Sequence, residues 1–514
     1  MHDHPRVDHV VIGIDGDFPL SEPRVVAIQA VGSPIWPHVE KTGVLCLSTT
    51  AFSAPAGQRI KTTFQNAMEV LQMDASLRSS EFREEFISYW SQEVDGRIPE
   101  ALSLLDGRQE DRDIVWWRIG TSRIVLAESA AQMSDWLRNQ GRQVPTHFRS
   151  TRLHCLPEPL EPEQFPRIGA DVMALVGRSE IERHLLAGSS LPIVIGCIIH
   201  EQPVFVATEI HGPNEKHVEK GFRPSRPRSA QILADSYRCR PISRLIVRRA
   251  DAAWIHGRGN NPDFERLKDA SVAVVGCGAI GGYLARGLAQ AGVGHLMLVD
   301  RDQLAPNNIG RHVLGMEWAT YAKSRALAGQ IQRDFPHVRE IAYSSKNFQN
   351  LTPTELCALS KYDAVILAGI DLPGELAVDR WRHSLSIGPA LIWTWIEEFA
   401  LAGHAAALFA PDSVRDCLDA DGCFNMRLTS DWPKGSASAV EAGCAVVYQP
   451  YNAVDMMGTV SLAQRLTLDV LLGKVQASVL RSWLGNRDEA LSRGCKVSSD
   501  FDRSFSEILR QWKH

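Results

Sequence analysis

Two motifs in this chain contain residues that can do chemistry. His38 stands eight positions before Cys46 in the stretch WPHVEKTGVLCL, and far downstream Gly276, Gly278 and Gly281 form a GxGxxG pattern directly after the apolar run SVAVV. A cysteine thiol can act as a nucleophile that forms a covalent intermediate. Glycines at this spacing let backbone approach phosphate at a helix N-terminus. Together the motifs suggest that a carboxylate is activated with ATP, captured as a thioester and passed on.

Length and composition describe an ordinary globular protein of several domains. The chain has 514 residues, 44% of them hydrophobic and 22% charged, with a formal net charge of −5. Single cores stop growing beyond roughly 250 to 300 residues, so two to four domains are expected. Neither disorder nor broad nucleic-acid binding fits this composition. Bulk charge identifies no partner.

The cysteines and the apolar runs indicate a cytosolic protein. The N-terminal residues MHDHP carry no basic and apolar leader, and the apolar run 191–199 is too short to cross a bilayer, so no membrane association is expected. The ten cysteines are scattered, without the density of a disulfide framework. No CxxC pair is present, which argues against a structural zinc site of the ribbon type.

The first ninety residues predict a small α+β domain. The β-branched runs 10–14 and 25–28 bracket a turn-rich segment and predict strands, while apolar periodicity predicts helices over about 62–73 and near 82–90. The blocks FPLSEP, WPHV and GVLCL, in this order and spacing, resemble the core of ubiquitin-conjugating enzymes over roughly residues 8–92.

This resemblance assigns roles to Cys46 and His38. Cys46 falls at the thioester-forming cysteine, and His38 takes the place of the family's Asn eight positions earlier. The family's N-terminal helix and first strand are not found ahead of this core. A histidine there can donate a hydrogen bond to developing negative charge or accept a proton from an incoming amine. The plainer alternative is that Cys46 is a small buried hydrophobe.

Residues from about 95 to 255 carry fewer signals and are expected to form a small mixed domain. The segment LPEPLEP at 156–162 is rich in proline and acid and reads as an extended linker, and the runs 191–199 and 204–208 predict strands. Arginines cluster between 223 and 249. This basic stretch either faces phosphate or an acidic partner, or is simply a solvated surface.

The third region begins with a Rossmann-like unit. The run SVAVV feeds the glycine motif, a helix-compatible segment follows to about residue 292, and a second apolar strand ends in Asp300. An acid at this distance can bind ribose hydroxyls. Taken alone, this fingerprint would favour a nicotinamide dehydrogenase.

The following residues change that interpretation. The stretch DRDQLAPNNIGR, a later Ala-Lys pair and the run VILAGID resemble the ThiF-like adenylyltransferases, which include ubiquitin-activating enzymes, over roughly residues 255–475. The resemblance assigns Asp300 to the ribose, Asn308, Arg311 and Lys323 to the triphosphate, and Asp371 to Mg²⁺. Carboxylate attack on a phosphate needs such positive charge and an oxygen-ligated metal. Taken singly, Arg311 and Lys323 could instead be exposed helix residues paired with Glu317.

The resemblance also implies an activating cysteine and a homodimer. Cys444 is the preferred nucleophile, because EAGC precedes a predicted helix over 453–472, as the family's cysteine does. Cys417, in a segment expected to be exposed, and Cys423 are the alternatives. Arg258 occupies the place of an arginine that reaches the partner subunit's ATP site. Other cysteines that we expect to serve only in packing are Cys277 and Cys357.

The sequence thus predicts an α/β protein with a ubiquitin-conjugating-like domain (1–95), a linker and middle domain (96–255) and a Rossmann-like doubly wound adenylation domain (256–514). It is similar to the activating and conjugating fusion enzymes of antiphage (CBASS-type) defence islands. That similarity implies ATP and Mg²⁺ as cofactors. The expected substrate is a ubiquitin-like protein or the C-terminus of a cGAS-like nucleotidyltransferase, joined to a target lysine.

Three alternatives stay open. A sulfur-carrier adenylyltransferase of cofactor biosynthesis with an unrelated N-terminal domain would keep its activity after Cys46→Ala. A non-catalytic scaffold would not catalyse ATP/pyrophosphate exchange, so Asp371→Ala would have no exchange activity to abolish. An NAD-dependent dehydrogenase would bind nicotinamide and would not need Lys323.

Overall fold

The computed structural model describes residues 7–29, 35–40, 42–47, 54–92, 100–120, 123–185, 189–212, 230–257, 262–440 and 447–512. The chain divides into two compact units. The first comprises Met1–Ser134 with Val144–Ala250, and the second comprises Asp251–His514 with Asp135–Gln143. Across the described residues, no helix combines the length and apolarity needed to span a membrane. The three-domain boundaries drawn from the sequence stay a prediction.

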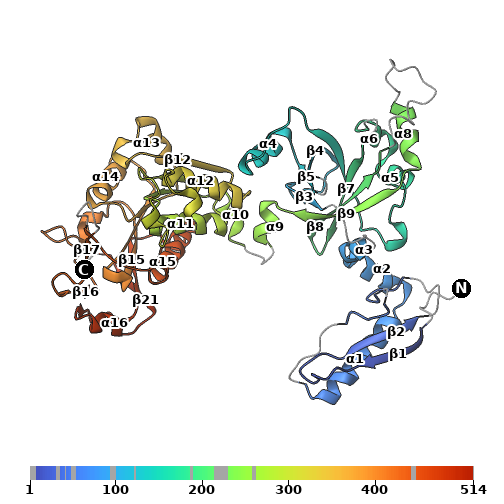
Figure 1. Ribbon diagram of the computed structural model, residues 1–514, viewed down its shortest axis with the longest axis horizontal. Coiled ribbons are helices and arrows are strands. Elements are labelled where there is room, and N and C mark those ends of the chain that lie inside the picture. The colour runs from blue at the N-terminus through green and yellow to red at the C-terminus, as the bar shows by residue number, and fades with distance from the viewer. Residues whose placement is uncertain are drawn as a thin grey trace. The chain divides into compact units, whose positions relative to one another are not determined.

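The N-terminal segment is a two-stranded antiparallel sheet with three helices (Figure 1). Its elements are β1 (Val7–Gly13), β2 (Arg24–Gln29), α1 (Ala56–Leu71), α2 (Ala75–Glu84) and α3 (Phe86–Gln92). The predicted strands and helices are therefore confirmed. The helix α1 turns Thr63, Ala67 and Val70 inward at helical spacing, and the two apolar ones pack against Trp36 and Leu45.

A closed seven-stranded barrel follows, with strand order β3-β5-β4-β6-β7-β8-β9 (Figure 1). The strands are β3 (Ala101–Ser103), β4 (Arg112–Ile119), β5 (Arg123–Ala127), β6 (Arg149–Cys155), β7 (Leu191–Ile199), β8 (Gln202–Ile210) and β9 (Ile242–Arg249). The helices are α4 (Ala130–Asn139), η1 (Pro162–Gln164), α5 (Gly169–Val176), α6 (Arg178–Glu182) and α8 (Ala230–Arg238). Alternate residues such as Ile114 and Trp116 fill the interior.

The predicted linker at 156–162 is wrong. These residues continue from β6 into η1 within the barrel unit, and Leu160 is buried against the aromatic cluster of Phe86, Trp90 and Phe165. Proline and acid here mark a surface turn whose apolar residues still pack inward. The strand predictions for 191–199 and 204–208 are confirmed, because these runs lie in β7 and β8.

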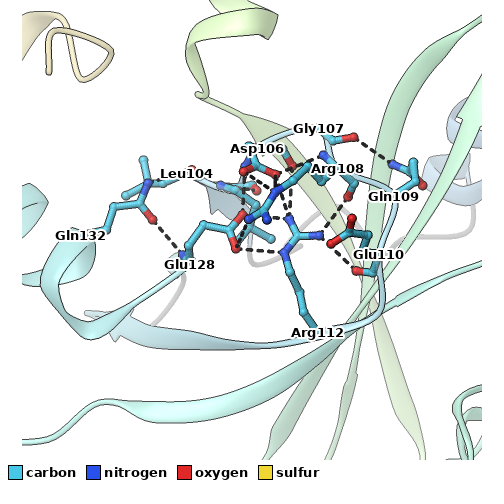
Figure 2. Close-up of polar contacts among 11 residues, drawn as sticks. Leu104, Asp106, Gly107, Arg108, Gln109, Glu110, Arg112, Glu128 and Gln132 are labelled. Carbon is cyan, nitrogen blue, oxygen red and sulfur yellow. Dashed lines mark hydrogen bonds and ion pairs between the residues drawn. The ribbon is translucent and has the colours of Figure 1, made fainter.

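A network of polar side chains ties the ends of three barrel strands together (Figure 2). Arg112, at the start of β4, donates from Nη2 and Nε to the two carboxylate oxygens of Glu128 at 2.8 and 2.9 Å. Its Nη2 also lies 3.2 Å from Oδ1 of Asp106, which follows β3. Gln132 accepts from the Glu128 N–H and donates to the Leu104 carbonyl. A forked guanidinium thereby fixes the β3–β4 connection against the end of β5.

The second unit is built on an eight-stranded sheet of order β12-β11-β10-β13-β14-β15-β19-β21. The strands are β10 (Ser271–Val275), β11 (His295–Val299), β12 (Glu340–Ser344), β13 (Ala364–Ala368), β14 (Ala390–Ile396), β15 (Ala402–Leu408), β19 (Val479–Leu484) and β21 (Ser506–Gln511). The first five in spatial order are parallel, and the last three join antiparallel. The strand order reverses direction between β10 and β13, which is where doubly wound folds bind ligands.

Helices cover both faces of this sheet. They are α9 (Ala252–Gly257), α10 (Phe264–Leu267), α11 (Ala279–Ala291), α12 (Lys323–Asp334), α13 (Pro353–Leu359), α14 (Leu372–His383), α15 (Ala453–Leu471) and α16 (Arg487–Ser492). Alternate strand residues face two separate cores: α11, α12 and α15 pack on one, and α13 and α14 on the other. The predicted Rossmann-like doubly wound architecture is therefore confirmed.

Short elements complete this unit. They are η2 (Pro306–Asn308), η3 (Met316–Trp318), η4 (Phe348–Asn350), η5 (Glu398–Ala400), η6 (Val414–Cys417), and the strand pairs β16 (Thr429–Ser430) with β20 (Lys496–Val497) and β17 (Ala439–Val440) with β18 (Val447–Tyr448).

Candidate active sites

A cavity of about 230 Å³ lies at the carboxyl ends of β10, β11 and β13, at the reversal of strand order. It brings together five of the residues predicted to bind the nucleotide: Gly276, Gly278, Asp300, Lys323 and Asp371. The sequence positions span almost a hundred residues, and the parallel sheet collects them because each follows a strand or begins the next helix.

The three glycines serve different purposes. Gly276 has φ 94°, and a Cβ there would lie 2.5 Å from the Ala368 carbonyl oxygen. A Cβ on Gly281 would lie 1.8 Å from the Gly276 carbonyl oxygen, so this glycine permits the turn to close and does not line the cavity. Gly278 begins α11, and a Cβ on it would meet no atom within 4 Å. Backbone at Gly278 therefore leaves open space for an anion at the N-terminus of α11.

Asp300 is held rigidly at the end of β11. Its Oδ2 accepts from the Cys277 N–H and its Oδ1 from the Asp302 N–H, both at 2.7 Å. Burial raises the pKa of Asp300, and these two hydrogen bonds together with Lys323 oppose that rise. The carboxyl group is thus fixed by the glycine turn that it faces.

Two lysines line the cavity in different surroundings. Lys323 begins α12, its side chain is 11% exposed, and Nζ lies 3.2 Å from Oδ2 of Asp302. Lys346 is 44% exposed and lies 2.9 Å from Oε2 of Glu355. The sequence interpretation missed Lys346, although its place just after the β12 run was a usable signal. Asn347, Phe348 and Gln349, in the same connection, also line the cavity.

Asn308 and Arg311 are not among the residues that line the cavity. Oδ1 of Asn308 accepts from the Ala305 N–H at 3.2 Å, and the guanidinium of Arg311 lies over the ring of Tyr451 at 4.9 Å. Their assignment to a triphosphate stays a prediction.

Asp371 provides the oxygen ligand that a hard cation prefers. It caps α14 through Oδ1, which accepts from the Gly374 N–H at 2.9 Å, and it lines the cavity. The described part of the chain contains no group of three His, Cys, Asp or Glu side chains arranged to hold a metal. Mg²⁺ often binds through one carboxylate together with substrate phosphates and water. The residues present fit that mode of binding.

The second candidate site surrounds Cys46. The side chain of Cys46 is exposed, and its backbone N–H donates to the His38 carbonyl at 2.8 Å. His38 adopts φ 58°, which is unusual for a residue with a side chain. The two predicted residues are therefore neighbours through the backbone, and the alternative interpretation of Cys46 as a buried hydrophobe is wrong.

Carboxylates surround the imidazole of His38. Its Nε2 lies 2.9 Å from Oε2 of Glu81 and its Nδ1 lies 3.4 Å from Oε1 of Glu85, while its backbone N–H donates to the Tyr89 hydroxyl. In this conformation Nε2 of His38 is hydrogen-bonded to Glu81, so this nitrogen is not available to an oxyanion or an amine. The sequence interpretation missed these three partners, although the glutamates stand at helical i, i+4 spacing.

The cysteines proposed for activation differ in accessibility. Cys417 is fully buried in a core of the second unit, with Sγ 4.0 Å from Sδ of Met426, so its expected exposure is wrong. Cys423 is exposed. Cys444 and Arg258 lie outside the described residues. Cys277 is buried as expected, whereas Cys357 is exposed and the packing interpretation for it is wrong.

A buried polar network anchors the segment that follows Cys423. His404 lies 2.8 Å from both Oε1 of Glu397 and Oγ of Ser482. Glu397 also accepts from the backbone N–H groups of Leu428 and Thr429 at 2.7 Å. Burial would raise the pKa of Glu397, but these donors, His404 foremost, hold it below its usual value.

Two known families match separate parts of this chain. Residues 255–400 match the ThiF family, and residues 1–99 match prokaryotic E2 family B. The chain therefore joins an E2-like N-terminal segment to a ThiF segment, which confirms the fusion predicted from the sequence.

The similar proteins carry related names. ATP-dependent ubiquitin transferase-like protein Cap2 of Vibrio cholerae is 30% identical over 257 residues, covering 47% of this chain and 42% of the relative. Cap2 of Pseudomonas aeruginosa is 32% identical over 263 residues, covering 49% and 44%. Adenylyltransferase and sulfurtransferase MOCS3 of Sus scrofa is 40% identical over 116 residues, covering 22% and 25%. The chain thus aligns with less than half the length of these relatives.

Proposed function

We propose that this chain uses ATP to activate the C-terminal carboxylate of a protein substrate, captures it as a thioester and passes it through Cys46 to an amine. The observation that carries this proposal is the cavity that gathers Gly278, Asp300, Lys323 and Asp371, in one chain with an exposed Cys46 in an E2-like segment. An energised carboxylate and an accessible thiol are the two requirements of thioester transfer.

The nucleotide would occupy the cavity at the strand reversal. Asp300 would accept hydrogen bonds from the ribose hydroxyls, and the triphosphate would lie over Gly278 and the N-terminus of α11, where backbone N–H groups and the helix dipole favour anions. Lys323 would balance phosphate charge. Asp371 would hold Mg²⁺, which supplies further positive charge to the phosphates when bound. Arg311 and Asn308 keep their proposed place at the triphosphate.

The reaction begins with an adenylation and continues with three acyl transfers. In the adenylation, a carboxylate oxygen attacks the α-phosphorus, an acyl adenylate forms and pyrophosphate leaves. A cysteine thiol displaces AMP, and Cys46 exchanges with that thioester before an amine, which we propose to be a lysine, attacks the carbonyl and releases the thiol. Cys444 is the proposed first acceptor, and Cys423 is the alternative because its side chain is exposed.

His38 is proposed to position the loop that holds Cys46. Because both ring nitrogens lie against Glu81 and Glu85, the imidazole ties this loop to α2. Since the Cys46 N–H bonds to the His38 carbonyl, movement of one residue shifts the other. A direct role for His38 toward an oxyanion or amine would require it to release these carboxylates.

The proposed partners follow from the resemblance. The substrate would be a ubiquitin-like protein or the C-terminus of a cGAS-like nucleotidyltransferase, and the chain would form a homodimer through its adenylation domain in the cytosol, as part of antiviral defence. The two-fold arrangement would be isologous.

Trapping of the thioester tests the proposal. Tagged chain is recovered from its source cells under denaturing conditions without reductant, and adducts are compared before and after dithiothreitol. We expect an adduct that dithiothreitol removes and that depends on Lys323 and Asp371. Cys46→Ser should convert the terminal adduct to an oxyester that resists dithiothreitol but not hydroxide. Absence of any reductant-sensitive adduct in cells that contain the substrate would overturn the proposal.

One alternative keeps support. The MOCS3 relative, named an adenylyltransferase and sulfurtransferase, aligns with only 22% of this chain. If this chain activates a sulfur carrier in the same way, Cys46→Ala leaves adenylation and its product unchanged, whereas the preferred function loses conjugation completely.

A further inference from the structure

A second cavity, of about 340 Å³, lies on the barrel of the first unit and plays no part in the proposed function. Aromatic rings line it, namely Trp116, Trp117 and Phe148, together with Ser150, Arg183 and His184. Cavities of this kind, mostly apolar with a few convergent polar groups, are common ligand sites. The polar groups here form an ordered chain.

Ser150, His184 and Asp113 lie in series. Oγ of Ser150 is hydrogen-bonded to Nδ1 of His184 at 2.9 Å, and Nε2 of His184 lies 3.3 Å from Oδ1 of Asp113, within ion-pair distance but without the geometry of a hydrogen bond. Ser150 is on β6 and Asp113 on the neighbouring β4, where Asp113 pairs with Arg152 and Ser150 with Val115. Residues two apart on a strand share a face, so the register places both side chains on the same side of the sheet. His184 follows α6 and lies between them.

Within this series of polar residues, the exposed fraction of the side chain is higher for Ser150 than for His184. Ser150 is exposed and lines the cavity, as His184 does, whereas Asp113 does not line it. The His184 side chain is only 4% exposed, whereas the Asp113 side chain is 47% exposed, outside the cavity. This arrangement is of the kind that activates a serine nucleophile. The hydroxyl is open to a ligand, the imidazole lies behind it, and a carboxylate lies near the other ring nitrogen, Nε2.

The charges suit this arrangement. Burial lowers the pKa of His184, although Asp113 opposes the change, so the imidazole is neutral and able to accept a proton near pH 7. Burial would raise the pKa of Asp113, but the hydrogen bond from Arg152 and the charge of Arg183 hold it below its usual value. The carboxylate is therefore ionised and able to orient the histidine.

A similar set elsewhere shows why the cavity matters. Ser482, His404 and Glu397 are also linked in series at 2.8 Å, but these side chains are buried in the sheet and have no more than 3% exposure. No substrate reaches that serine. Of these two sets, the one on the barrel opens onto a cavity.

We propose that Ser150, His184 and Asp113 form a second active site that hydrolyses small esters with a flat, apolar group. Oγ of Ser150 attacks the ester carbonyl carbon and His184 takes its proton at Nδ1. The bond to the leaving oxygen breaks, the proton passes to that oxygen and an acyl-serine remains. Water, deprotonated by His184, then attacks the acyl carbon, the bond from this carbon to Oγ breaks, a carboxylic acid leaves and His184 returns the proton to Oγ. Asp113 is a positioning residue.

The walls of the cavity define the substrate class. The rings of Trp117 and Phe148 meet edge to face at 6.0 Å, and the guanidinium of Arg149 lies over the ring of Trp116 at 5.3 Å. Flat apolar groups pack well against such rings. Arg183 also lines the cavity, and its guanidinium pairs with Glu180 and lies 3.8 Å from Oδ2 of Asp113.

Covalent labelling tests this site directly. The full chain carrying Cys46→Ala, which removes the exposed thiol of the proposed conjugating site, is treated with a fluorophosphonate probe, and the modified residue is identified by mass spectrometry. Hydrolysis of p-nitrophenyl butyrate is followed in parallel. We expect the adduct on Ser150, and a loss of at least about 100-fold in labelling rate and hydrolysis in Ser150→Ala and His184→Asn.

Two further variants separate catalysis from structure. Ser236→Ala removes a part-exposed hydroxyl that donates only to the Leu233 carbonyl, and it should change neither rate. Asp113→Asn should lower kcat at least about 10-fold with little change in KM, as expected for a residue that orients the base. The proposal fails if Ser150 is not labelled, if His184→Asn is labelled as fast as the parent, or if ester turnover survives Ser150→Ala.

Discussion

Replacement of Lys323 by methionine should remove most of the affinity for ATP. Methionine keeps a similar unbranched length, so packing at the start of α12 changes little while the charge is lost. The Lys323 side chain is 11% exposed, and therefore acts in surroundings that screen charge less than bulk water.

The size of the effect follows from Coulomb's law. Two unit charges about 4 Å apart interact by about 4 kcal/mol at an effective dielectric constant of about 20. Asp302, at 3.2 Å from Nζ, already satisfies part of this charge and reduces the net gain. A loss of about 2 to 4 kcal/mol remains, which is about a 30- to 1,000-fold weaker binding of ATP. Asp302→Asn should instead strengthen ATP binding, because it removes a negative charge beside the phosphates.

Lys346→Met is the matched control. Lys346 lines the same cavity, but it is 44% exposed and forms an ion pair with Glu355. Exposed ion pairs contribute about 0 to 1 kcal/mol, so we expect at most about a fivefold change. Titration calorimetry with ATP and Mg²⁺ measures binding without the protein substrate. Equal losses in both variants, or a change under about threefold in Lys323→Met, would refute the proposed phosphate site.

Three further predictions concern stability. Burial raises the pKa of Glu375 to about 7, so the folded state keeps a proton that the unfolded chain loses above a pH of about 4.5. The free energy of unfolding should therefore fall as the pH rises from about 4.5 to about 7. Glu375→Gln should remove up to about 3 kcal/mol of this pH dependence, measured by urea unfolding at pH of about 5 and about 8. His404→Leu leaves the carboxylate of Glu397 buried without its main partner and should cost about 3 to 5 kcal/mol, seen as a lower calorimetric Tm; a loss below about 1 kcal/mol would contradict the network. Arg112→Met should cost about 1 to 3 kcal/mol in denaturant unfolding (Figure 2), whereas Arg138→Met, which breaks an exposed pair, should be neutral within about 0.5 kcal/mol.

Much of the second unit was predictable from local pattern. The runs SVAVV and AVILA form β10 and β13, and the GxGxxG motif forms the turn into α11. Apolar runs that form strands buried on both faces can be recognised from neighbouring residues alone. The same holds for glycines that permit a close turn. The resemblance to ThiF-like adenylyltransferases led us to expect Asp300, Lys323 and Asp371 at one site, and all three line one cavity, while their roles toward a nucleotide stay a prediction.

The barrel and its cavity were not predictable in this way. Residues 156–162 resemble a linker by composition, yet Leu160 packs into an aromatic cluster of the barrel unit. Ser150 and His184 are separated by 34 positions, and no spacing rule predicts their contact. Barrel closure depends on pairings between strands distant in sequence, such as β3 with β9.

The sequence by itself determined which residue types are available: a thiol at Cys46, a glycine turn at 276–281, and acids and a lysine after the strands. Tertiary structure alone decided which are accessible and which are engaged. Cys417 is buried although its neighbours are polar, and His38 faces Glu81 and Glu85 although its spacing to Cys46 suggested catalysis. The physical reason is that burial and ion pairing depend on side chains brought together from distant parts of the chain, whereas turns and strands depend on neighbouring residues.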